Sequence, residues 1–167
     1  VMVAEPDAIF MPNYTQNNVI AVQNRAQLGL DIPILGALDH CPPFATIVGD
    51  PELADNIYVA DNVSYSDPRL DELKIPYMED TGEEPTNKVY LGWDAAHILK
   101  WVVENTGATD AAGFTEGLAQ VKDLDLLTGT FTMNPETHMP EGLPAVMYKI
   151  EKGVYVELGP YNYVPLE

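Results

Sequence analysis

The stretch Pro6–Gly36, PDAIFMPNYTQNNVIAVQNRAQLGLDIPILG, predicts one strand–helix–strand unit. Short apolar runs at Ala8–Met11 and Ile32–Leu35 are typical of buried parallel strands. Between them, apolar residues recur at helical spacing over Thr15–Leu28, and Gly29 is placed to end the helix in a left-handed turn. We therefore expect two adjacent parallel strands joined by a right-handed crossover helix.

Polar and aromatic side chains follow both predicted strands. Open parallel sheets bind ligands just outside the carboxyl ends of their strands, and those ends here are residues 12–15 and 36–40. The sequence therefore predicts a small-molecule site there. Its candidate ligand-binding residues are Asn13, Tyr14, Thr15, Asp39 and His40.

The remaining sequence alternates helical and strand patterns, which argues for an α/β or mixed topology. It first predicts a short helix from Pro42-Pro43 to Val48, a strand over Asn56–Asn62 and a polar connector over Val63–Arg69. Three helices are expected next: one over Asp71–Asp80 interrupted by Pro76, a long one over Asn87–Thr106 closed by Gly107, and one capped by Thr109 or Asp110. The chain should end with a strand over Leu127–Met133, a loop over Asn134–Gly142, and a hairpin of strands Leu143–Ile150 and Val154–Leu158 around Lys152-Gly153.

Composition restricts the partners. The chain of 167 residues is 46% hydrophobic, which is ordinary for a globular protein. Its 8 basic and 26 acidic residues give a formal charge of −18, which would repel nucleic-acid phosphates and anionic lipids. Cys41 is the only cysteine, so no intrachain disulfide can form. No apolar run reaches the ~18 residues needed to span a bilayer.

Several blocks of the sequence resemble a known family in the correct order. They are PDAIFMPNYTQN, GDPELADNIYVAD, LGWDAAHILKWVVENTGATD and LTGTFTMNPETHMPEGLPAVMYKIEKGVYV. Together they resemble the C-terminal half of type I substrate-binding proteins of bacterial ABC importers, the branched-chain amino acid receptor family. The resemblance implies part of a two-lobe α/β fold of parallel-sheet lobes with flanking helices, with the N-terminal half absent.

The resemblance also divides the chain. It implies a second-lobe segment over residues 1–63, a segment over 64–133 that crosses to the first lobe and forms part of it, and a return hinge with C-terminal strands over 134–167. Hinges are expected near Val63–Asp67, Leu127–Thr130 and Asn134–Gly142, because a few loop residues can absorb a domain rotation. A fragment of this kind should leave an open sheet edge or an apolar face, so we expect self-association as a remedy.

The function implied by the resemblance is extracytoplasmic capture of a small polar solute, such as an amino acid or a related small organic acid or amide, by closure of two lobes. Family members are secreted or lipid-anchored and their precursors carry a signal peptide. The implied partners are the solute and the permease and ATPase subunits of an ABC importer. No bond is made or broken, so no enzymatic activity and no cofactor are expected.

The resemblance assigns roles to two of the candidate residues. An aromatic side chain after the first strand, here Tyr14, packs on the ligand in the family, although such a residue can also cover the edge of a core. An acidic residue after the second strand pairs with a ligand ammonium, and Asp39 or the position of Leu38 corresponds to it. Asp39 could equally form an Asx-turn or a helix N-cap before Pro42-Pro43.

Some residues also fit other interpretations. Asp39-His40-Cys41 could ligate a metal, but no second cysteine and no histidine spacing complete a tetrahedral site. Asp94 and His97 could pair across one helical turn on a surface. No catalytic signature sequence is present. The alternatives to solute capture are a flavodoxin-like enzyme and the ligand-sensing domain of a receptor or regulator.

Overall fold

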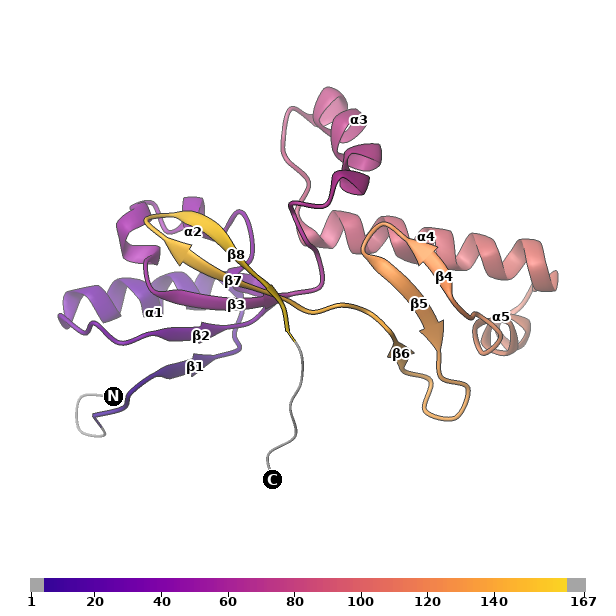
Figure 1. The fold of residues 1–167 in the computed structure, drawn as a ribbon, viewed down its shortest axis with the longest axis horizontal. Coiled ribbons are helices and arrows are strands. Elements are labelled where there is room, and N and C mark those ends of the chain that lie inside the picture. The colour runs from indigo at the N-terminus through magenta and orange to yellow at the C-terminus, as the bar shows by residue number, and fades with distance from the viewer. Residues whose placement is uncertain (1–4, 162–167) are drawn as a thin grey trace. The chain divides into compact units, whose positions relative to one another are not determined.

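The computed structural model describes residues 5–161. The chain forms two compact units, which we call unit 1 (Val1–Asp61 with Ala145–Glu167) and unit 2 (Asn62–Pro144). It therefore passes between the units twice, after Asp61 and after Pro144. Figure 1 shows unit 2 as an insertion between the first three strands of unit 1 and its last two.

Unit 1 is built on a five-stranded sheet of order β1-β2-β3-β7-β8. Strands β1, β2 and β3 are parallel, and β7 and β8 form an antiparallel hairpin beside β3. The predicted strand–helix–strand unit is thereby confirmed, including the parallel pairing of its two strands. The bounds are β1 Ile9–Met11, α1 Thr15–Gln27, β2 Ile34–Gly36, the 3-10 turn η1 Leu38–His40, α2 Phe44–Ile47, the 3-10 turn η2 Pro51–Ala54, β3 Ile57–Asp61, β7 Val146–Glu151 and β8 Val154–Pro160.

Helix α1 lies against the sheet through Val22, which is fully buried. The helix ends as predicted, because Gly29 takes a left-handed conformation (φ 64°) and the Leu30 N–H bonds back to the Arg25 carbonyl. The guanidinium of Arg25 is buried and donates to the carbonyls of Ile32, Leu53 and Asp55. These bonds attach the helix to the segments that precede β2 and β3.

Unit 2 packs three helices and a small antiparallel sheet of order β4-β5-β6. One apolar cluster forms around Tyr90 at the start of α4, and a second lies between α4, α5 and the β4–β5 hairpin around Val102 and Phe131. The bounds are the 3-10 turn η3 Pro68–Leu70, α3 Asp71–Thr81, α4 Asn87–Thr106, α5 Ala111–Leu118, β4 Leu124–Leu126, β5 Gly129–Met133 and β6 Pro140–Glu141. The predicted bounds of α4 are confirmed, and Asp110 caps α5.

Three sequence predictions about unit 2 are wrong. Pro76 does not interrupt α3, because the helical bond that it cannot donate would go to the carbonyl of Glu72, and both residues are exposed to water. The strand expected over Leu127–Met133 is a turn at residues 127–128 followed by β5, paired with an additional strand β4. The short strand β6 lies in the segment expected to be a loop.

The division into units also differs from the expected segments. The structure sets the boundaries after Asp61 and Pro144, so residues 134–144 belong with unit 2. Of the three expected hinge segments, Leu127–Thr130 is the turn of a hairpin inside unit 2, and Asn134–Gly142 also lies within that unit. Which lobe of a two-lobed protein each unit forms stays a prediction.

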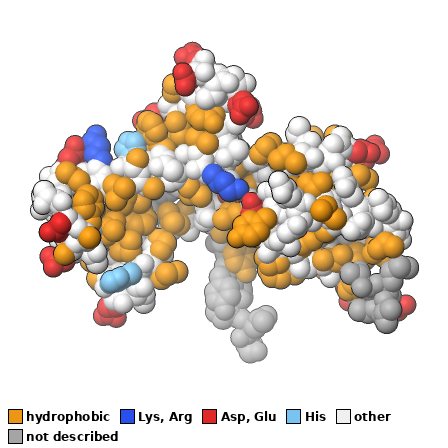
Figure 2. Space-filling view, turned by 180° about the vertical axis from the view of Figure 1, so that it is seen from behind, with side chains coloured by type: hydrophobic (Ala, Val, Ile, Leu, Met, Phe, Trp, Pro, Cys, Tyr) orange, Lys and Arg blue, Asp and Glu red, His pale blue; other side chains and the backbone are white. Residues whose placement is uncertain are grey.

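The exposed surface combines apolar side chains with acidic ones. Figure 2 shows hydrophobic side chains on the visible face of both units, with acidic side chains toward the edges. In unit 2 the exposed apolar residues include Leu99 and Val103, which are 49% and 46% exposed one turn apart on α4. Within residues 5–161, no helix is both long enough and apolar enough to cross a membrane.

Candidate functional site

The candidate site lies where β1 and β2 end. Their parallel register pairs Met11 with Gly36, so the loops that follow the two strands leave the same edge of the sheet. The first loop leads directly into α1 at Thr15, and the second forms η1 over Leu38–His40. This arrangement brings together residues that are 24 positions apart in the sequence.

The outer layer of the site consists of polar side chains from both loops. The Thr15 hydroxyl donates to Asp39 Oδ1 at 3.1 Å, and both residues are half-buried. Asn13 Oδ1 accepts from the Tyr14 N–H at 2.8 Å and from Asn17 Nδ2 at 3.1 Å. The Tyr14 side chain is 78% exposed. A carboxylate, a hydroxyl and an aromatic ring therefore stand within two adjacent loops.

Beneath this layer, Asn18 and His40 are both fully buried. Asn18 Nδ2 donates to the Asn13 carbonyl at 2.7 Å and lies 3.3 Å from His40 Nδ1. The same His40 nitrogen accepts from the Ala37 N–H at 3.3 Å. The imidazole packs on the Phe44 ring with centroids 4.8 Å apart, and burial lowers the pKa of His40 below its ordinary value.

The backbone around His40 is fitted to the ring. A Cβ at Gly36 would stand 2.6 Å from His40 Cγ and Nδ1, so only glycine lets the imidazole lie against the end of β2. From β8, the Tyr155 hydroxyl donates to the His40 carbonyl at 2.8 Å and accepts from the Ala45 N–H at 3.2 Å. Burial raises the pKa of Tyr155, so this hydroxyl stays protonated and able to donate.

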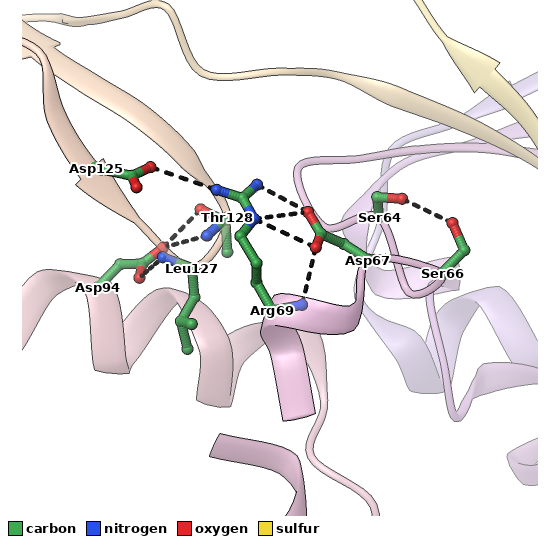
Figure 3. A network of polar contacts seen from close by, with 8 residues as sticks. All are labelled: Ser64, Ser66, Asp67, Arg69, Asp94, Asp125, Leu127 and Thr128. Atoms are coloured by element: carbon green, nitrogen blue, oxygen red, sulfur yellow. Dashed lines mark hydrogen bonds and ion pairs between the residues drawn. The ribbon is translucent and has the colours of Figure 1, made fainter. Parts of the chain in front are cut away.

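Unit 2 holds a separate polar network, drawn in Figure 3. The buried carboxylate of Asp94 on α4 accepts from the backbone N–H groups of Leu127 and Thr128 at 2.9 and 3.0 Å, and from the Thr128 hydroxyl at 2.6 Å. The expected surface pair of Asp94 with His97 is therefore wrong. His97 Nδ1 instead lies 2.9 Å from the Trp93 carbonyl, one turn back on the helix.

Arg69 completes this network at the surface of unit 2. Its guanidinium bonds both carboxylate oxygens of Asp67 and reaches Asp125 Oδ1 at 3.3 Å. These bonds from Arg69 hold the pKa of Asp67 below its usual value. A hollow of about 340 Å³ lies beside the arginine, lined also by Glu72, Trp93 and His97. Arg69 is already paired with two carboxylates, so its charge beside the hollow is compensated by Asp67 and Asp125.

Comparison with known proteins decides the family. A sequence model of the periplasmic binding protein family matches residues 1–153, which is most of the chain. The chain belongs to the periplasmic binding protein family. A search of curated protein sequences gave no significant match.

Solved structures of periplasmic binding proteins share the fold. The leucine-binding protein LivK of Thermotoga maritima has a TM-score of 0.82 at 22% identity, over 96% of this chain and 46% of its own. LivJ of Streptococcus pneumoniae, solved with isoleucine, has a TM-score of 0.77 at 24% identity, over 90% and 44%. A solute-binding protein of Rhodopseudomonas palustris, solved with benzoate, has a TM-score of 0.78 at 17% identity, over 95% and 44%. This chain thus spans less than half the length of each.

The residues predicted to form the site of this periplasmic binding protein do not all lie at its surface. Thr15 and Asp39 are hydrogen-bonded to each other, and the neighbouring Tyr14 is exposed, while a joint role of Tyr14 and Asp39 in binding a solute stays a prediction. His40, expected to line a cleft, is instead fully buried beneath the two loops. The helix-capping alternative for Asp39 is wrong, because Pro43 occupies the N-cap position of α2.

One residue of the site was missed altogether. Asn18 follows Asn17 on a polar stretch of α1, and nothing in the local sequence distinguishes a buried asparagine from an exposed one. Within the described residues 5–161, no group of three or more His, Cys, Asp or Glu side chains is arranged to hold a metal ion.

Proposed function

We propose that this periplasmic binding protein captures a small polar solute for an ABC importer, and that the solute is an amino acid or a related small organic acid or amide. The observation that carries the proposal is the pairing of Thr15 with Asp39 beside the exposed ring of Tyr14, outside the carboxyl ends of two parallel strands. Support for the solute class comes from relatives solved with isoleucine, leucine and benzoate.

The chemistry of the loops suits an ammonium group. A carboxylate offers about four lone-pair positions, so Asp39 can accept from several donors at once, the Thr15 hydroxyl among them. A hydrogen bond between ionised groups is roughly twice as strong as a neutral one. The ring of Tyr14 would cover the apolar part of the solute, where aromatic burial contributes through contact area.

Capture would proceed by hinge closure. The chain crosses between the units after Asp61 and after Pro144, and these two connections are the places where a rotation could be absorbed. We assign the hinges to residues 62–67 and 142–146 accordingly. The closed form would then be recognised by the permease subunits, with the ATPase supplying the energy.

The family indicates an extracytoplasmic location. Periplasmic release and attachment to the cell surface through a lipid both agree with that location. We propose the permease and the ATPase of an ABC importer as the partners on the same grounds.

The test is calorimetric titration of the complete natural protein with L-leucine, L-isoleucine and benzoate. We expect an α-amino acid to bind and Asp39→Asn to weaken it by about 2–5 kcal/mol, the cost of leaving a buried charge without its partner. Asp7→Asn is the matched control, because this exposed carboxylate precedes β1 and so lies toward the opposite end of the strand. Equal affinity in Asp39→Asn and the parent protein would remove Asp39 from the site. Binding of benzoate alone would overturn the amino acid proposal.

A further inference from the structure

The buried pair beneath the site joins the two loops through one histidine nitrogen. The Ala37 N–H donates to His40 Nδ1 from the loop after β2, and the Asn18 side chain reaches the same atom from α1, each at 3.3 Å. Asn18 is also bonded to the Asn13 carbonyl in the loop after β1. His40 Nδ1 is thus the point at which the two loops are connected below the surface.

The protonation of this nitrogen follows from its neighbours. The atom of Asn18 that lies 2.7 Å from the Asn13 carbonyl must be the amide nitrogen, because a carbonyl oxygen only accepts. That orientation directs an N–H group at His40 Nδ1, to which the backbone N–H of Ala37 also points. With two donors directed at it, Nδ1 must be an acceptor. The imidazole is therefore neutral, with its proton on Nε2.

We propose that Asn18 and His40 are positioning residues of the solute site: they hold the loops after β1 and β2 in the one arrangement in which Thr15 meets Asp39, and they do so only while the imidazole is neutral. The predicted effect on solute affinity rests on the proposed function. The geometry of Asn18 and His40 does not depend on it.

Protonation would undo the arrangement. A second proton would occupy Nδ1, where it would face the N–H groups of Ala37 and Asn18, and both donors would lose their acceptor. A buried donor without a partner destabilises the arrangement that contains it. The loops would separate to rehydrate these groups, and the contact between Thr15 and Asp39 would be lost with them. Mild acid should therefore release the solute.

The groups around His40 favour the neutral form on balance. Asp39, on the same turn, is the charge that favours imidazolium, and burial outweighs it. Phe44 from α2 and Asn18 from α1 do not titrate, and the Tyr155 hydroxyl from β8 stays protonated. The Cys41 thiol and the Asp61 carboxylate of β3 are further ionisable groups on this side, since both act on Tyr155.

The first test needs no solute. Nitrogen-15 spectra of the imidazoles in the full chain should show His40 as the Nε2–H tautomer at neutral pH. On acidification, the Ala37 amide and the Asp39 side-chain carboxyl carbon should shift together with the His40 ring. A proton on Nδ1 at neutral pH, or an Asp39 signal that does not follow His40, would overturn the proposal.

The second test uses variants of the complete protein and L-leucine as the probe. His40→Asn places an acceptor oxygen near the position of Nδ1 without a titratable group, so it should keep most of the affinity at neutral pH. Between about pH 7 and pH 5, which spans the ordinary pKa of histidine, its affinity should fall several-fold less than that of the parent. Asn18→Ala should lower affinity about tenfold at neutral pH, and the exposed Asn24→Ala on the same helix should not.

The two tests separate the proposals. If L-leucine does not bind but the spectra behave as expected, the proposed solute is wrong and the positioning role stands. If L-leucine binds and His40→Asn shows the same loss of affinity in acid as the parent, the positioning role is overturned and the proposed function stands.

Discussion

Unit 2 and unit 1 each bury polar side chains next to a turn, but they satisfy them differently. In unit 2, the Asp94 carboxylate receives three hydrogen bonds of 2.6 to 3.0 Å from the β4–β5 turn. In unit 1, the Asn18–His40 contact is 3.3 Å long, and Asn18 Oδ1 and His40 Nε2 are buried without a partner among the residues that the structure describes.

We call the Asp94 network the structural anchor of unit 2, and we expect the Asn18–His40 pair of unit 1 to adjust more easily. Breaking the Asp94 network would leave backbone donors buried and unpaired, so the network resists change. In unit 1 the two contacts at His40 Nδ1 are longer, at 3.3 Å each, so we expect them to be broken at a lower cost. We therefore expect substitutions around Asp94 to affect stability, and substitutions around His40 to affect binding more than stability.

The largest effect is expected at Asp94. Asp94→Ala leaves the N–H groups of Leu127 and Thr128 buried without an acceptor, at about 1–3 kcal/mol each, so unit 2 should lose about 4 kcal/mol of stability. Both tryptophans, Trp93 and Trp101, lie on α4 of unit 2, so tryptophan fluorescence during urea unfolding reports this unit. A loss below 1 kcal/mol would show that the anchor is not structural.

A control within the same network separates the charge from the hydroxyl. Thr128→Val removes only the bond from the hydroxyl to Asp94 and keeps the backbone donor, so it should cost about 1 kcal/mol. If the two variants cost the same, the backbone bonds contribute nothing and the interpretation of the network is wrong.

Two glycines, one in each unit, test the difference between unit 1 and unit 2. In unit 2, a Cβ at Gly117 would lie 2.5 Å from Val102 Cγ1, in the interface of α5 with α4, so Gly117→Ala should cost about 1–3 kcal/mol by overpacking. In unit 1, the Cβ of Gly36→Ala would displace the His40 ring, 2.6 Å away. We expect it to lower solute affinity about tenfold or more while the tryptophan unfolding curve stays unchanged.

Both glycine variants are measured by the same two experiments, urea unfolding and calorimetric titration with L-leucine. The expected outcome is a crossed result, with a stability loss for Gly117→Ala and an affinity loss for Gly36→Ala. If Gly36→Ala kept its affinity, the fit of His40 against β2 would have no bearing on the site.

The sequence predicted those elements that local rules determine. The bounds of α4 follow from apolar spacing and from Gly107, which takes the left-handed conformation at its end. The strand–helix–strand unit follows in the same way from two apolar runs and Gly29. In contrast, β4 reads Leu-Asp-Leu and has no continuous apolar run like those at β1 and β2, so its local sequence does not indicate a strand.

The polar residues that the sequence did not predict to be buried depend on contacts between distant segments. Asn18 contacts His40, which η1 brings against α1 from 22 residues further along the chain. Asp94 is likewise defined by a turn 33 residues away. Local pattern places both residues on a helix, but it cannot say which polar side chain on that helix will be covered by another segment.

A smaller effect on the stability of unit 1 is expected from a change of pH. Because the pKa of His40 is lowered in the folded protein, the unfolded chain binds more protons just below the ordinary pKa of about 6.5. The contribution of His40 to stability is therefore complete above that pH and is lost as the pH falls through the folded value. Amide hydrogen exchange in β2 and α1 at pH ~7 and ~5.5 measures it.

The matched control for the pH effect is His40→Asn, in which the loss of protection with acid should be smaller. Unit 2 provides an internal reference, because α4 lies in a different compact unit from His40 and we expect its amide exchange to be the same in both proteins. Equal loss of protection in the parent and in His40→Asn would assign the acid effect to carboxylates instead.

The smallest effect is expected at the surface end of the unit 2 network. The ion pair between Arg69 and Asp125 is 3.3 Å long, and its side chains are 49% and 79% exposed. Water and salt screen such a pair, so Asp125→Asn should change the stability of unit 2 by less than about 0.5 kcal/mol. Arg69 keeps its bonds to Asp67, which lies on the same connector and holds the guanidinium in place. Urea unfolding at low and at high salt should therefore give nearly the same difference between Asp125→Asn and the parent. A loss comparable to that of Asp94→Ala would mean that the network is coupled as a whole, and that the anchor extends from α4 through Arg69 to the connector between the units.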